Sequence, residues 1–199
     1  PIILSTGMAN WMDIQLAIDT SRAVGNEKIA LLQCTSLYPA PINLSNLNSI
    51  RTMKETFNVI TGYSDHTLGD HMCIAAVSLG ANIIEKHFTM DRDLPGPDHS
   101  FAIEPQELKQ LMQRLRDVES AFGDGIKNGP QNEEREMYEK GRRSLHAATT
   151  IRKGQVIEKS DLVVKRPGLG VPPYLIEQVI GRIAKYDIEE DNWITWDMI

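Results

Sequence analysis

The sequence is poor in the features that mark nucleic-acid-binding and membrane proteins. It has 21 Lys and Arg against 27 Asp and Glu, and a formal net charge of −6 at pH 7. No dominant basic stripe is present that would meet a phosphate backbone. No apolar run approaches the roughly 20 residues that cross a bilayer. We therefore expect neither a nucleic acid nor a membrane as the principal partner.

Cysteine is also scarce. The two cysteines, Cys34 and Cys73, stand at no metal-ligand or redox spacing within the 199 residues. Isolated cysteines of this kind are typical of reduced thiols, so we expect a cytoplasmic protein. The chain opens on Pro-Ile-Ile-Leu, a run that looks like a buried strand, and we expect an upstream portion to precede it.

Four short apolar runs recur at similar intervals, and each is too short for a helix. They are Ile2–Ser5, Ile29–Cys34, Asn58–Thr61 with Gly62 and Tyr63, and Asn82–Glu85 running into His87. Segments with helical apolar spacing follow at 11–24, 47–57, 73–77 and 105–118. Asn10 is the expected N-cap of the first, and Pro105 takes the first position of the last. Four βα units in a row predict parallel strands with right-handed crossovers.

The unusual residues follow the strands, whereas the returns from helix to strand are plain. This asymmetry indicates an α/β barrel or a doubly wound sheet with its site at the carboxyl ends of the strands. Four units make half a barrel, and a half-barrel alone leaves two sheet edges unpaired. We therefore favour a piece of a longer enzyme over a pair of copies that complete one another.

Composition divides the chain into three parts. Residues 1–122 carry the βα units, and residues 123–143 read as a linker that ends in a short exposed helix. From Ser144 to Ile199, turn signals separate short β-like pieces, which predicts a small second domain of mostly irregular β structure. These pieces are Leu145–Ile151, Val156–Ile157, Leu162–Lys165 and Trp193–Thr195.

Two histidines, His66 and His87, follow the third and fourth predicted strands. Neighbouring parallel strands lie about 4.8 Å apart, so imidazoles at matching heights can each reach within about 2 Å of one ion. Two protein nitrogens leave coordination positions for water and substrate, as a Lewis-acid metal requires. The alternative is that each His satisfies a backbone group. We favour the metal because Ser64, Asp65 and Glu85 flank the pair.

Glu85 and Lys86 are consecutive charges in a strand that we expect to be buried on both faces. Burying an unpaired charge is costly, so both need compensation. Two interpretations stay open: the pair contacts substrate, or it pairs with charges in the upstream half of a barrel.

Other polar residues also follow the predicted strands. Ser5 precedes a helix, where hydroxyls and backbone N–H groups can meet an anion, although an ordinary turn fits equally well. Tyr38 closes the second strand and either lines a pocket or plugs it. The long polar loop 91–105 offers Asp98 and His99, with Asp98 as an acceptor for sugar hydroxyls; the alternative is a solvent-exposed Asp.

Five strings in one order resemble motifs of the sialic acid synthase family, which includes N-acetylneuraminate, legionaminate and pseudaminate synthases. They are Leu4-Ser5-Thr6-Gly7-Met8, Cys34-Thr35-Ser36-Leu37-Tyr38-Pro39, Gly62-Tyr63-Ser64-Asp65-His66-Thr67, Glu85-Lys86-His87-Phe88-Thr89 and Gly96-Pro97-Asp98-His99. Any one string is weak, but five in order are highly specific, and the resemblance runs from Pro1 to Ile199. It implies an α/β fold made of the C-terminal half (strands 5 to 8) of a TIM (β/α)8 barrel. A small β-rich antifreeze-like (SAF) domain would follow, because the segment through Lys165-Arg166-Pro167-Gly168 resembles that domain.

The resemblance implies a metal-dependent condensation of phosphoenolpyruvate with N-acetylmannosamine, or a related amino sugar, to a sialic acid and phosphate. His66 and His87 would bind the divalent metal, with Mn²⁺ as the first choice and Mg²⁺ or Co²⁺ as alternatives. Ser5, Ser36 and Ser64 would help to bind phosphoenolpyruvate. Many family members carry Asn in place of Ser36, and a serine lacks the hydrogen bond of that amide.

The remaining implied site residues are Tyr38, Asp98 and Arg166. Tyr38 and Asp98 would contact the amino sugar, and Arg166 would reach it from the partner subunit of a domain-swapped homodimer. Lysines that grip phosphate and a catalytic glutamate would belong to the absent first half of the barrel. Which nonulosonic acid is made is left open.

Two rival functions remain. One is another aldol-type, metal-dependent barrel enzyme that condenses phosphoenolpyruvate with a sugar phosphate. Such an enzyme should need a second phosphate-binding site, and the loops of this sequence offer no basic cluster for it. The other is a non-catalytic carbohydrate- or ice-binding module. Ice adsorption wants a flat, largely uncharged face, whereas Lys153, Lys159, Lys165 and Arg166 crowd that region.

Overall fold

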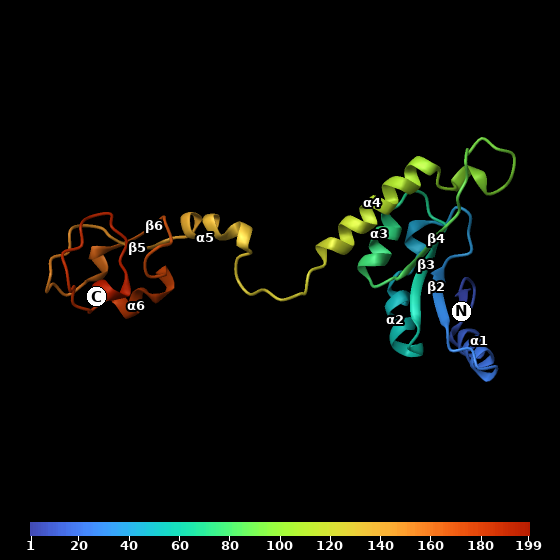
Figure 1. Ribbon diagram of the computed structural model, residues 1–199, viewed down its shortest axis with the longest axis horizontal. Coiled ribbons are helices and arrows are strands. Elements are labelled where there is room, and N and C mark those ends of the chain that lie inside the picture. Colours follow the sequence, from blue (N-terminus) through green and yellow to red (C-terminus); the bar gives the residue numbers. More distant parts are fainter. The chain divides into compact units, whose positions relative to one another are not determined.

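The computed structural model describes residues 1–199 and contains two compact units, Pro1–Gly125 and Ile126–Ile199. In Figure 1 the strands and helices of the first unit run from blue to yellow-green, and the compact part of the second runs from orange to red. None of the helices has the length and apolar character needed to cross a membrane.

The first unit is built on four parallel strands in the order β1-β2-β3-β4. These are β1 (Ile2–Ser5), β2 (Ile29–Cys34), β3 (Ile60–Asp65) and β4 (Ile83–Lys86). Each strand pairs with the next one along the chain, so the predicted parallel half-barrel sheet is confirmed. The third strand begins two residues later than its apolar run indicates. Asn58 instead ends the preceding helix in a left-handed conformation, with its N–H bonded to the Lys54 carbonyl.

Helices follow the strands as the apolar spacing predicts. They are α1 (Trp11–Ala23), α2 (Asn48–Phe57), α3 (His71–Ser78) and α4 (Pro105–Ala121), and Figure 1 shows α2, α3 and α4 along the sheet. Asn10 is the N-cap of α1, because its side chain accepts from Met12 and Asp13 while Asp13 accepts from the Asn10 N–H. Pro105 opens α4, where the missing N–H costs nothing.

Strand alternation gives the sheet two different faces. On one, which we call the helix face, Leu31 packs with Ile18 and Met53, and Tyr63 packs with Ile50. The opposite face, which we call the inner face, carries the alternate positions, including Gly62, Ser64 and the following His66. Every second residue of a strand therefore belongs to the packing against helices, and the others are available to the inner face.

The second unit begins with a 3₁₀ turn (Asn132–Glu134) and α5 (Arg135–Gly141), which lie in the predicted linker. An antiparallel pair, β5 (Ser144–Ala147) and β6 (Leu162–Lys165), and the short α6 (Ile176–Val179) follow. The predicted strand 145–151 is cut short at Ala147, where the partner strand β6 is preceded by the 3₁₀ turn Lys159–Asp161. Three of the predicted β positions pair only as isolated bridges: Ile151 with Ile188, Val156 with Ile183, and Trp193 with His146.

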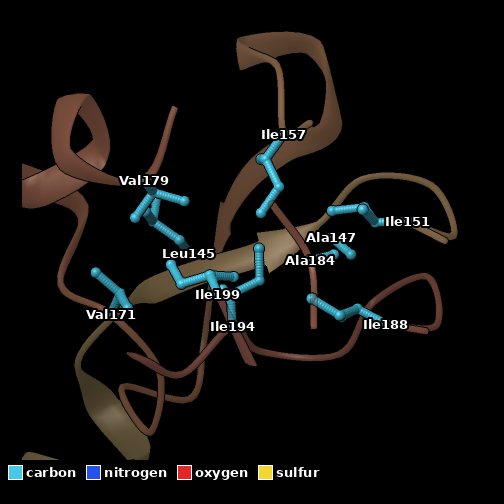
Figure 2. Close-up of a cluster of buried hydrophobic side chains, with 10 residues drawn as sticks. All are labelled: Leu145, Ala147, Ile151, Ile157, Val171, Val179, Ala184, Ile188, Ile194 and Ile199. Carbon is cyan, nitrogen blue, oxygen red and sulfur yellow. The ribbon is translucent and has the colours of Figure 1, made fainter. Parts of the chain in front are cut away.

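The second unit has its own hydrophobic core (Figure 2), with ten buried side chains that come from strands, turns and the carboxyl-terminal segment. They are Leu145, Ala147, Ile151, Ile157, Val171, Val179, Ala184, Ile188, Ile194 and Ile199. All are aliphatic, and most are Leu, Ile or Val, for which burial of one side chain contributes about 1.5–3 kcal/mol. The stability of this unit therefore comes from irregular segments that converge on one core more than from its two-stranded sheet.

Candidate active site

His66 lies directly after β3 and is buried. Its Nδ1 is 2.8 Å from the Thr35 carbonyl oxygen, which comes from the segment after β2. Because a carbonyl can only accept, Nδ1 carries the hydrogen and Nε2 keeps a free lone pair. This backbone contact is the kind of outer partner that orients a metal-binding imidazole.

His87 lies directly after β4, with its ring centroid 5.1 Å from that of His66 and the ring planes at 79°. With nitrogen–metal bonds of about 2.1 Å, two rings at this separation can share one ion. No group of three or more His, Cys, Asp and Glu side chains in the chain is placed to hold a metal. An ion at this position would therefore have two imidazole ligands from this chain.

Tyr38 and Phe101 surround the two imidazoles with aromatic rings. The Tyr38 ring lies 4.3 Å from His66 and 5.6 Å from His87, and Phe101 lies 5.0 Å from His87. Tyr38 is half exposed whereas Phe101 is buried. Tyr38 therefore contacts both imidazoles, and whether it lines or plugs a pocket there stays a prediction.

Asp98 approaches His87 from the long loop after β4, with Oδ2 3.7 Å from Nδ1 and a side chain that is 61% exposed. The loop is fastened beside it, because His99 Nδ1 lies 2.7 Å from the Thr89 hydroxyl. Arg92 also bonds the Ala102 carbonyl, at 2.9 Å. An open carboxylate on an anchored loop can accept hydrogen bonds from a polyol.

Ser64 and Glu85 lie on the inner face one step below the histidines and are paired in register on β3 and β4. The Ser64 hydroxyl donates to Glu85 Oε1 at 2.7 Å. Glu85 therefore has a partner within this unit. The structure brings Ser64 under the two imidazoles, as its place two residues before His66 implies.

Ser5 ends β1 and Ser36 follows β2, further along the same edge of the sheet. Ser5 is exposed and Ser36 is half-buried. A Cβ on Gly7 would lie 2.6 Å from the Ser36 hydroxyl, so only glycine lets that hydroxyl approach the turn after β1. The Ser36 hydroxyl therefore lies beside the turn after β1, apart from the aromatic contacts of the imidazoles.

The partner of Lys86 is neither a substrate nor an upstream charge, so both interpretations of its charge from the sequence are wrong. Its Nζ lies 2.8 Å from Asp65 Oδ2, and the two side chains are 6% and 0% exposed. Its partner is therefore on the neighbouring strand, and not a substrate or an upstream segment. Each of these residues precedes a histidine, and strand alternation turns both onto the helix face. That pattern is the signal in the sequence that predicts the pair.

Cys73 of α3 contacts the same carboxylate, with Sγ 3.1 Å from Asp65 Oδ2. Burial, and next the Asp65 charge, raise the pKa of the Cys73 thiol, so it stays protonated and donates. Burial likewise raises the pKa of Tyr63 to about 12. Both groups are therefore neutral and serve in packing behind the sheet.

Arg166 belongs to the second unit, directly after β6, and is exposed. It lines a hollow of about 570 Å³ together with Met137 and Tyr138 of α5 and Arg142, which follows α5. The carbonyl of Pro167, the residue after Arg166, accepts from the Ser144 hydroxyl at 2.6 Å. Arg166 is thus carried on a turn that is tied to β5.

The fold and the histidine pair define an α/β protein with a parallel half-barrel and a polar site at the carboxyl ends of its strands. The sequence profile of the NeuB family matches residues 1–127, and that of the SAF domain matches residues 142–199. The chain therefore belongs to the NeuB family and carries a SAF domain.

Several relatives of the chain are named as synthases. The N,N'-diacetyllegionaminic acid synthase of Campylobacter jejuni is 43% identical over 97% of this chain, and that of Legionella pneumophila is 40% identical over 100% of this chain. Among solved structures, the spore coat polysaccharide biosynthesis protein SpsE of Bacillus subtilis is 36% identical. The match covers 100% of this chain and 61% of the SpsE chain, with a TM-score of 0.60. The chain spans 57–58% of the length of the two synthases.

Proposed function

We propose that this chain forms the metal-binding half of a synthase that condenses phosphoenolpyruvate with an N-acetylated amino sugar to a nonulosonic acid and phosphate. The single observation that carries the proposal is the convergence of His66 and His87, with centroids 5.1 Å apart, at the carboxyl ends of β3 and β4. The family of the chain and the names of its relatives support the reaction class.

The imidazoles of His66 and His87 would hold the divalent metal, which we propose to be Mn²⁺, with Co²⁺ and Mg²⁺ as alternatives. When bound, the metal would supply Lewis-acid stabilisation of charge on the aldehyde oxygen of the sugar. The Thr35 carbonyl keeps His66 in the tautomer that presents Nε2. Tyr38 and Phe101 would limit the access of water to the pair.

The neutral hydroxyls of Ser5, Ser36 and Ser64 would donate to phosphoenolpyruvate oxygens, and these donors strengthen where negative charge collects. Tyr38 and Asp98 would bind the amino sugar, the carboxylate accepting from its hydroxyl groups. The new carbon–carbon bond joins C3 of phosphoenolpyruvate to the aldehyde carbon. Water then adds at C2, and phosphate leaves by cleavage of the C–O bond.

The finer parts of the proposal follow from the family. The four strands would be strands 5 to 8 of a complete (β/α)8 barrel in a cytoplasmic protein. Arg166 of the SAF domain would contact the sugar bound by the partner subunit of a swapped homodimer. N-acetylmannosamine is the first sugar to test. Diacetylated 6-deoxy analogues are next, because the relatives quoted above are named for N,N'-diacetyllegionaminic acid.

The test uses the complete synthase, with the upstream half of the barrel that the proposal requires, and replaces each proposed ligand in turn, as His66→Ala and His87→Ala, with His71→Ala as the control. His71 is an exposed residue at the start of α3, outside the site. Mn²⁺ binding is followed by the electron paramagnetic resonance signal of the free ion, and turnover by phosphate release. We expect either ligand variant to weaken Mn²⁺ binding by more than about 100-fold, beyond the effect of an outer partner. The control should bind and turn over like the wild type.

Undiminished Mn²⁺ binding and turnover in either ligand variant would refute the assignment of the metal. The same assay with sugar phosphates in place of N-acetylmannosamine separates the rival enzyme class. Turnover with a sugar phosphate alone would replace the proposed acceptor.

A further inference from the structure

Behind the histidine pair, on the helix face, lies a buried ion pair that the proposed chemistry does not use. Lys86 Nζ donates to Asp65 Oδ2 at 2.8 Å and to the Thr67 carbonyl at 2.7 Å. The Asp65 side chain is fully buried and that of Lys86 is 6% exposed. The lysine is thus satisfied by two acceptors within the fold, and neither acceptor is a substrate group.

The acceptors of Lys86 are the two chain neighbours of His66. Asp65 precedes that histidine and Thr67 follows it, and the Thr67 N–H donates back to Asp65 Oδ1 at 2.8 Å. Lys86 itself precedes His87 on β4. The side chain of Lys86, the residue before His87, is therefore bonded to both chain neighbours of His66. We call Asp65, Thr67 and Lys86 the clamp.

A buried ion pair is a poor source of stability, because desolvation of two charges offsets their attraction. Its best-attested contribution is to fix a register between elements. Here register has a direct chemical consequence. A slip of β4 by one residue would turn His87 onto the helix face, and a slip of two would move it by about 6.6 Å along the strand.

The inner face offers little else that could fix this height. The only side-chain hydrogen bond on that face between β3 and β4 is that of Ser64 with Glu85, two residues before the histidines. The His66 ring is further held by the Thr35 carbonyl, but the His87 ring contacts only other rings and the distant Asp98 carboxylate. The His87 backbone carbonyl accepts from the Ile103 N–H at 2.8 Å, which holds the chain but not the ring. The position of His87 relative to His66 therefore depends on the strand that carries it, and the clamp joins that strand to β3 at the adjacent residue.

We propose that Asp65 and Lys86 are positioning residues that hold the two imidazoles at one height and thereby set the affinity of the metal site. This inference rests on the proposed function, since it assigns the clamp to the metal site of His66 and His87. Neither residue touches the ion or the substrates. They act through the backbone of the histidine that each precedes.

The test compares Mn²⁺ affinity in folded proteins. The principal variant is Asp65→Leu/Lys86→Met, which removes both charges and keeps apolar volume, so it avoids an unpaired buried charge. The second variant, Asp65→Asn/Lys86→Gln, removes the charges but keeps polar groups, and it decides the matter if the apolar pair does not fold. The control, Asp70→Asn/Arg114→Gln, removes another ion pair of the same half-barrel, between the start of α3 and α4.

Folding is checked by circular dichroism and Mn²⁺ Kd by titration against the free-ion resonance signal. We expect the clamp variants to raise the Kd at least about 10-fold, the effect typical of lost outer support, and the control to stay within about twofold. A folded clamp variant with the wild-type Kd would overturn the inference while leaving the metal site intact. Equal Mn²⁺ uptake by wild type and His66→Ala would instead refute the proposed function itself.

Discussion

Gly62 is the residue at which a single methyl group should disturb the site most directly. It lies in β3 on the inner face, four residues before His66, and pairs with Ile83 of β4. A Cβ at Gly62 would lie 2.3 Å from the Ile83 carbonyl oxygen and 2.6 Å from Leu32 Cδ2. Ordinary contact begins at 3.4 Å, so β4 would have to withdraw by about 1 Å.

The size of the effect follows from what must move. Overpacking a core costs about 1–3 kcal/mol, and the obstacle here is backbone and not a flexible side-chain end, so we expect about 3 kcal/mol from Gly62→Ala. Because β4 carries His87, the same withdrawal should separate the imidazoles. A misplacement of about 1 Å can cost a factor of about 100 in turnover, and we expect a loss of that order.

The measurements are thermal unfolding, Mn²⁺ affinity and phosphate release for wild type, Gly62→Ala and the control Gly141→Ala. Gly141 ends α5, where the nearest atom to a new Cβ is the flexible Met137 Sδ at 3.1 Å. The control should change stability by no more than about 1 kcal/mol and leave Mn²⁺ binding unaltered. Wild-type stability and turnover in Gly62→Ala would show that the sheet absorbs the methyl group, and the reasoning would be wrong.

Two further predictions concern support away from the site. Glu107 closes the capping box of α4: its carboxylate accepts from the Glu104 N–H and then from Arg92, and both contacts lower its pKa. Its contribution is therefore present above the ordinary Glu pKa of about 4.3 and lost as the pH falls through the lowered value. Glu107→Gln should cost about 0.5–1 kcal/mol at pH 7 in urea unfolding and nothing at low pH, whereas a pH-independent difference would contradict the ion-pair account. Leu145→Ala, at a fully buried position of the second unit, should cost about 2–5 kcal/mol in the same assay. The Mn²⁺ Kd should stay that of the wild type, and a changed Kd would contradict the assignment of metal binding to the first unit alone.

The order of elements could be predicted from local patterns because short apolar runs and helical spacing act over a few residues. Asn10 and Pro105 mark helix starts through bonds within one turn, and both were predictable. The start of β3 was not, since Asn58 can extend a strand or adopt the left-handed conformation, and only the end of α2 decides between them. In the second unit, single bridges such as Ile151 with Ile188 depend on contacts between distant segments, which no periodicity records.

For the site, the adjacency of His66 and His87 could be predicted because equivalent ends of neighbouring parallel strands must meet. The pairing of Lys86 with Asp65 was missed, although it follows from the same alternation applied to the preceding residues. A charge in a buried strand needs a compensating group, and that group can belong to the same sheet. The residue at the matching position of the next strand is the first candidate to examine.

The sequences Asp65-His66 and Lys86-His87 therefore divide two tasks between the faces of one sheet. On the inner face, two imidazoles that hold a metal, as we propose, would need open coordination positions, so they could not be packed tightly from that side. Their placement would then come from elsewhere, and the nearest side chains that share their strands without sharing their face are their immediate neighbours. A pair of opposite charges suits this role better than two apolar residues, because a hydrogen-bonded ion pair satisfies its partners in one register only, whereas apolar side chains tolerate sliding. The Mn²⁺ affinity of the clamp variants is thus a direct measure of how far the helix face determines the chemistry of the inner face.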